Sequence, residues 1–159
     1  FLPLTLVVAV AYVLTIPFNF WRPFEQRDVL IVYNLMLFAV MALLVFATPV
    51  ATANVSPSML RWLRRGIMAV AVLTLLVSLY ALSATVYRTV QGGWTINRLT
   101  IIGWNVINMA ILAHLIYGQW RATGSAWLDA VYRSCRVGSI AYAEWTVFLL
   151  LALPWLFPI

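Results

Sequence analysis

The stretch YRTVQGGWTINR, residues 87–98, separates two apolar runs near the middle of the chain. Its paired glycines, Gly92 and Gly93, are the strongest turn signal in the sequence. Thr95 stands where a helix N-cap is expected, directly before an apolar run over about 96–118. A second apolar run, over about 66–87, precedes the turn. The pattern therefore predicts two long helices joined by a tight loop.

The composition explains what surrounds these helices. Of the 159 residues, 65% are hydrophobic and 9% are charged, whereas a soluble domain is about half apolar and about a quarter charged. A soluble fold of this size could not bury so much apolar surface, so lipid is the expected solvent. The runs lack the alternation of a β-barrel strand. The sequence therefore predicts an all-α, polytopic membrane helical bundle.

Three further apolar runs, over about 2–18, 29–48 and 138–157, resemble the first two in length. At ~1.5 Å per residue, a run of about 20 residues reaches the ~30 Å thickness of the hydrocarbon core. Together the five runs predict about five transmembrane helices in a single domain over 1–159. We expect Asp28, Ser56 and Ser125 to act as N-caps. Because the chain opens inside an apolar run and without methionine, we expect it to be part of a longer protein.

The segment 119–137, between the last two runs, has a different pattern. Asp129, Arg133 and Arg136 fall on one helical face, and Leu128, Val131 and Cys135 fall on the other. This pattern predicts an in-plane amphipathic helix at the membrane surface, separate from the span over 138–157.

The formal net charge of +6 comes from ten arginines and four acids. The arginines are spread among the connections, which excludes the clustered basic stripe of a nucleic-acid-binding surface. The second and fourth connections hold six of them and the first and third hold four. This bias favours the cytoplasmic side for the second and fourth connections and the outer side for residues 87–98. Arg61, Arg64 and Arg65 either hold anionic lipid head groups or only mark this topology.

Two ionisable residues, His114 and Glu144, fall inside predicted spans. Burying such groups in lipid is costly, so each is a candidate functional residue. If their spans are antiparallel neighbours, both lie roughly 6–9 Å below the same interface. We expect them to pair, either as a protonatable site or as a structural clamp. Alternatively, Glu144 reaches Arg121 or Arg136 near the interface.

His114 has a second interpretation, as the axial ligand of a chlorophyll-type pigment or haem. A b-type haem usually takes two axial side chains, and the sequence offers one histidine; a chlorophyll needs only one. A single cysteine excludes an internal disulfide and a cysteine-based zinc site. The sequence contains no nucleophile elbow, P-loop or paired-carboxylate motif, so we expect the protein not to be an enzyme.

Amides and hydroxyls also lie inside the predicted spans. Asn105 and Asn108 share one helical face, and Asn34 lies in the span over 29–48. Interhelical hydrogen bonds of this kind contribute roughly 0.6–2 kcal/mol in lipid. The three asparagines either join helices or partner chains together or line a polar pathway.

The loop over residues 87–98 also resembles a motif of a known protein family. Tyr87, followed by Gly93, Trp94, Thr95 and Arg98 at a helix start, resembles the Tyr…Gly-x-Thr-x-x-Arg motif of a family of bacterial multi-spanning membrane proteins classed as a domain of unknown function. The resemblance covers about residues 80–159. It implies a bacterial inner (cytoplasmic) or intracytoplasmic membrane protein and brings no known activity.

Arg98 is the residue of this motif with the clearest physical requirement. A cation in the first turn of a helix opposes the helix macrodipole. We therefore expect Arg98 to have a fixed partner, which is a lipid phosphate, a backbone carbonyl or an acid such as Glu25.

Three functions follow from these features. The first is an accessory or scaffold subunit of a larger membrane assembly, favoured because the sequence lacks the paired discontinuous helices of many transporters. The second is a solute or proton transport unit using His114, Glu144 and the asparagines. The third is a pigment- or haem-holding subunit. The expected partners are the lipid bilayer and other membrane protein chains, and not nucleic acid.

Overall fold

The chain folds into helices joined by short connections in a computed structural model that describes residues 2–46, 56–124 and 126–156. The elements are α1 (Leu2–Thr15), the 3-10 helix η1 (Pro17–Asn19), α2 (Arg22–Glu25), α3 (Arg27–Phe46), α4 (Pro57–Gly92), α5 (Ile96–Arg121) and α6 (Ala126–Leu156). The described residues form no strand, so the all-α prediction is confirmed.

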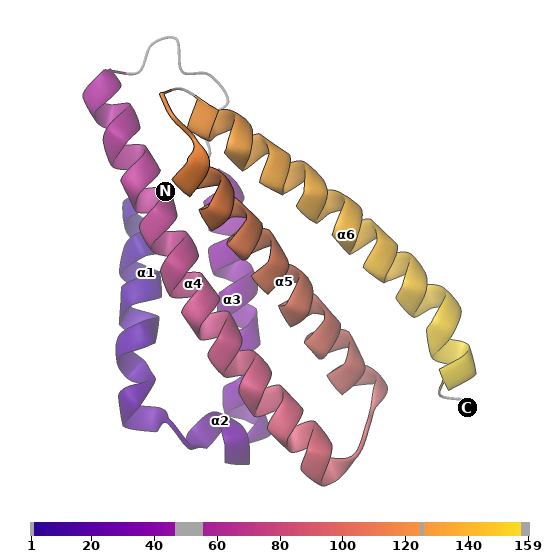
Figure 1. Cartoon of the computed structure of the whole chain (residues 1–159). Coiled ribbons are helices and arrows are strands. Elements are labelled where there is room, and N and C mark those ends of the chain that lie inside the picture. Colours follow the sequence, from indigo (N-terminus) through magenta and orange to yellow (C-terminus); the bar gives the residue numbers. More distant parts are fainter. Residues whose placement is uncertain (1, 47–55, 125, 157–159) are drawn as a thin grey trace.

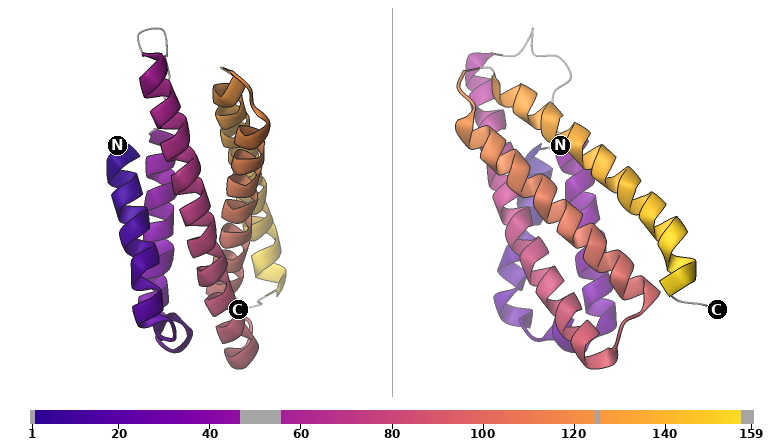
Figure 2. Two further views of the ribbon diagram at one scale, coloured as in Figure 1. Left: turned by 60° about the vertical axis from the view of Figure 1, so that its left-hand side comes forward. Right: turned by 45° about the vertical axis from the view of Figure 1, so that its right-hand side comes forward.

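The long helix α4 is the centre of the arrangement (Figure 1). It packs against α1 and α3 on one side and against α5 on the other, and α6 packs against α5. The two further views show the same order, with α1 and α3 on one flank and α6 on the opposite flank (Figure 2). The main core cluster lies in the half of the bundle nearest the α5–α6 turn, with Ile67, Val70 and Ala71 of α4 packed with Leu112 and Leu115 of α5.

Local signals set where α4 and α5 begin, as the sequence predicts. The Ser56 side chain accepts a hydrogen bond from the Met59 backbone N–H at 3.3 Å, and Pro57 occupies the first turn. The Thr95 side chain accepts one from the Arg98 N–H, also at 3.3 Å. Asp28 is not an N-cap: it lies inside the first turn of α3, where its charge still favours the helix dipole. Ser125 lies outside the described residues.

The predicted in-plane helix over 119–137 is wrong. Residues 119–121 end α5, and α6 runs without interruption from Ala126 to Leu156. Gly138 looks like the start of a new span, but it is a packing position: a Cβ there would lie 2.8 Å from Cδ1 of Ile111 on α5. The predicted faces of this segment are nevertheless correct, because Val131 is buried while Arg133 and Arg136 are exposed.

Among the described residues, three helices, α4, α5 and α6, are long and apolar enough to cross a membrane. The predicted count of five spans is not confirmed. The helix expected over 2–18 ends at Thr15, and its 14 residues extend only ~21 Å. The helix expected over 29–48 is described to Phe46, and the remainder of that range lies outside the described residues.

Candidate functional site

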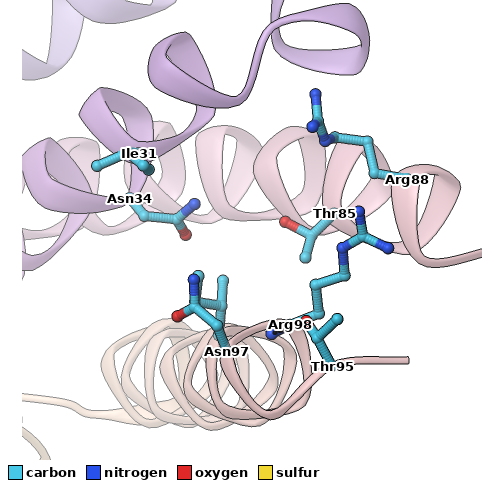
Figure 3. Close-up of a pocket in the computed structure, with 8 residues that line it drawn as sticks. Ile31, Asn34, Thr85, Arg88, Thr95, Asn97 and Arg98 are labelled. Atoms are coloured by element: carbon cyan, nitrogen blue, oxygen red, sulfur yellow. Dashed lines mark hydrogen bonds between the residues drawn. The ribbon is translucent and has the colours of Figure 1, made fainter. Parts of the chain in front are cut away.

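A cavity of about 330 Å³ with several polar side chains in its lining lies where α3, α4 and α5 meet beside the α4–α5 loop (Figure 3). We call it the loop pocket. Its polar lining residues are Asn34 from α3, Thr85 and Arg88 from α4, and Thr95, Asn97 and Arg98 from the start of α5. The reversal at Gly92–Gly93 explains why Arg88 and Arg98 line the same cavity, since they flank the turn on two antiparallel helices.

The two loop glycines have separate roles in holding Arg98. Gly93 adopts a φ of 76°, a left-handed conformation that favours glycine. Gly92 leaves room for the guanidinium, because a Cβ there would lie 2.8 Å from Nη1 of Arg98. Nη1 of Arg98 donates to the Gly93 carbonyl at 2.6 Å. Of the three partners expected for Arg98, the structure contains the backbone carbonyl.

Other residues of the loop motif lie outside the pocket lining. Trp94 is exposed, and Tyr87 packs edge-on against Phe24 of α2 with ring centroids 5.6 Å apart. Arg88 is half-buried in the pocket wall. Sequence reasoning did not single out Arg88, although it lies about as far before the glycine turn as Arg98 lies after it, which predicts that both are near the same end of the hairpin.

The three predicted asparagines join helices. Nδ2 of Asn105 donates to Oδ1 of Asn34 at 2.9 Å, linking α5 to α3 behind the loop pocket. The hydroxyl of Tyr142 on α6 donates to Oδ1 of Asn108 on α5. Oδ1 of Asn105 and Nδ2 of Asn108 are buried and have no hydrogen-bond partner among the described residues. Tyr142 was missed because nothing in the sequence indicates which α5 residue it faces.

The structure does not bring His114 and Glu144 together. Nδ1 of His114 lies 2.8 Å from Oγ of Ser134, whose hydroxyl donates to the Ala130 carbonyl at 2.9 Å. Because that hydroxyl has one proton, Nδ1 of His114 is the donor in this pair. Glu144 is exposed and lies ten positions beyond Ser134, ~15 Å further along α6. The expectation fails because α6 begins at residue 126, which puts Glu144 nearly three turns away from the level of His114.

The three arginines near the start of α4, which we call the arginine collar, divide into two kinds: Arg64 is hydrogen-bonded to the end of α5, and Arg61 and Arg65 are exposed. Nη2 of Arg64 donates to the Gln119 carbonyl at 2.6 Å and to the Ala122 carbonyl at 2.7 Å. A cation is favourable at a helix C-terminus, so Arg64 fastens the end of α5 to α4. Arg61 and Arg65 are exposed and remain available to head groups.

One face of α6 presents exposed residues at spacings of three and four. This face, the α6 outer stripe, comprises Asp129, Arg133, Arg136, Ile140 and Glu144. The opposite face is buried through Trp127, Val131, Ser134 and Gly138. The stripe therefore points away from the rest of the described chain.

Contacts between α5 and α6 fix the level of the outer stripe along the bundle. They pair Gly118 with Ala130, His114 with Ser134, and Asn108 with Tyr142. In this antiparallel register, Arg136 lies level with Leu112 and Glu144 lies level with Trp104. Arg136 and Glu144 are thus beside the middle half of α5, whereas Asp129 and Arg133 lie nearer its C-terminal end.

Comparison with known proteins returned no match of this chain to a family model, a curated protein or a solved structure.

Proposed function

We propose that this chain is a non-enzymatic, membrane-embedded subunit that binds a neighbouring membrane protein chain through the α6 outer stripe. The observation that carries the proposal is the position of Arg133, Arg136 and Glu144. All three are exposed, and Arg136 and Glu144 lie beside the middle half of α5, an apolar helix that is long enough to cross a bilayer.

The depth of these charges can be measured from α4 and α5. The stretches from Gly66 to Tyr87 and from Leu99 to Trp120 contain no Arg, Lys, Asp or Glu. Each spans about 33 Å at ~1.5 Å per residue, close to the ~30 Å hydrocarbon core. Relative to α5, Arg136 lies ~13 Å inside the level of Arg121, and Glu144 lies ~9 Å inside the level of Arg98.

Ionised groups at such depths are costly when they face lipid. An arginine side chain can extend toward the interface, which lowers the cost for Arg133. The Glu144 side chain is shorter, and no basic residue of the described chain forms a salt bridge with it. A partner helix that offers an acid near Arg136 and a donor near Glu144 would lower the cost for both groups.

A photo-crosslinking amino acid placed at Ile140 tests the proposal in membranes of the source cell. Ile140 lies between Arg136 and Glu144 on the stripe and is 53% exposed. Leu76, in the charge-free part of α4, is also 53% exposed and provides the matched control. We expect discrete protein adducts from position 140 and none from position 76.

A second measurement tests whether the charges are responsible. Arg136→Gln together with Glu144→Gln should lower the adduct yield at position 140 severalfold while leaving the helix content unchanged. Lipid adducts alone at both positions, in the unmodified stripe, would refute the proposed interface.

A further inference from the structure

The loop pocket contains an unbalanced concentration of positive charge. Arg88 and Arg98 both line it, and neither forms a salt bridge with an acid among the described residues. Arg98 donates one Nη1 hydrogen bond to the Gly93 carbonyl, and no hydrogen bond of Arg88 is found in the described chain. Each guanidinium has five N–H donors, so most of this capacity is unused.

The start of α5 adds to this positive potential. The first backbone N–H groups of α5, at Ile96 and Asn97, lie beside the pocket, and the Thr95 side chain caps only the Arg98 N–H. A helix N-terminus is equivalent to roughly half a positive charge and favours anions. Two cations and a helix N-terminus therefore face one cavity of about 330 Å³, and a bound anion would relieve their repulsion.

The depth of the loop pocket indicates which anion meets it. Arg88 ends the charge-free stretch of α4, and Arg98 begins that of α5. With ~33 Å of apolar helix on one side of them, both guanidinium groups lie at the level of lipid head groups. Phosphate is the common anion at that level, and guanidinium groups bind phosphate oxygens through paired hydrogen bonds.

We propose that the loop pocket is a phosphate-binding site, in which Arg88 and Arg98 together contact the phosphate of an anionic lipid head group or a free phosphate anion. Asn97 and Thr95 lie on the opposite side of the cavity from Arg88 and supply neutral donors (Figure 3). Arg98 is also held by the loop, so Arg88 is the residue whose change alters ligand binding without removing an internal hydrogen bond.

The test uses the full chain in nanodiscs and compares phosphatidylglycerol with phosphatidylcholine, and separately inorganic phosphate in detergent. Retained lipid is counted by native mass spectrometry, and phosphate binding is followed by the shift in melting temperature. Arg88→Gln should lower phosphatidylglycerol retention at least about tenfold, because it removes one charged group that forms hydrogen bonds with the phosphate. Arg88→Lys, which keeps the charge without the planar fork, should retain an intermediate amount.

Arg61→Gln is the matched control, because it removes the same charge from an exposed position at the other end of α4. Because Arg61 can contact head groups only at the surface, its loss should lower phosphatidylglycerol retention far less than the loss of Arg88, and it should leave the thermal shift with inorganic phosphate unchanged. Stabilisation by phosphatidylglycerol alone identifies a lipid ligand, and stabilisation by inorganic phosphate identifies a free anion; both support the site if they depend on Arg88. Equal retention and equal thermal shifts in Arg88→Gln and Arg61→Gln would overturn it.

Discussion

Replacing Arg64 by alanine should weaken the fold more than the same change at its neighbours. One nitrogen of Arg64 donates to two carbonyls at the end of α5, at 2.6 and 2.7 Å. Hydrogen bonds to charged groups contribute about 1.5–3 kcal/mol each. Arg64 is only partly buried, so the sum is reduced by solvent screening. We expect Arg64→Ala to lower the free energy of unfolding by ~2–4 kcal/mol.

The matched controls are Arg61→Ala and Arg64→Lys. Arg61 is exposed on the same turn region of α4, so its removal should cost less than ~0.5 kcal/mol. Lysine keeps the favourable charge near the helix C-terminus, worth ~0.3–1 kcal/mol, but its side chain is shorter and ends in a differently shaped group, so it should recover only part of the loss. Unfolding is followed by circular dichroism during titration of mixed micelles with a denaturing detergent. Values for Arg64→Ala and Arg61→Ala within ~0.5 kcal/mol of each other would refute the assigned role.

Three further changes test other contacts. Gly103→Ala should lower the free energy of unfolding by ~1–3 kcal/mol and alter tryptophan fluorescence, because the new Cβ would lie 1.9 Å from the indole of Trp145. Gly118→Ala is the control and should cost less, because its Cβ would lie 3.2 Å from that of Ala130. Asn105→Leu should cost ~0.6–2 kcal/mol, and the same change after Asn34→Leu should cost less, which a double-mutant cycle of unfolding free energies measures. Arg98→Ala should lower the melting temperature and the yield, because the α4–α5 loop loses its hydrogen bond to the Gly93 carbonyl; unchanged values would show that the loop is not held this way.

The sequence predicts the features of this fold that depend on neighbouring residues. Ser56 and Thr95 cap α4 and α5 because an N-cap needs only a side-chain oxygen and an N–H three positions later. The turn at Gly92–Gly93 likewise depends only on residues that are adjacent in the sequence. The two faces of α6 follow from helical spacing alone, so the separation of Arg133 from Val131 is correct even though the predicted helix boundary near residue 138 is absent.

The features that depend on how two helices meet could not be predicted in the same way. Gly138 is a plausible helix start in isolation, and only the position of Ile111 shows that it permits close packing. The pairing of His114 with Ser134, in place of Glu144, depends on the register between α5 and α6. The sequence indicates which polar groups need partners, but an error of nearly three turns in the register between α5 and α6 assigns the wrong partners.

The collar also shows why residues of one type cannot be treated as a group. Arg61, Arg64 and Arg65 are close in sequence, yet only Arg64 faces the end of α5. The chain length of the α4–α5 hairpin determines this, because it brings Gln119 back to the level of Arg64. No property of the collar itself distinguishes the three.

The equal charge-free lengths of α4 and α5 have a consequence for where the protein can reside. Both stretches extend for about 33 Å, slightly more than an average hydrocarbon core. A thinner membrane would force this rigid hairpin to tilt or would make the surrounding acyl chains stretch, whereas a thicker one would accommodate it upright. The length of the hairpin therefore favours bilayers of matching thickness. The protein should partition into thicker regions when membranes of two thicknesses coexist.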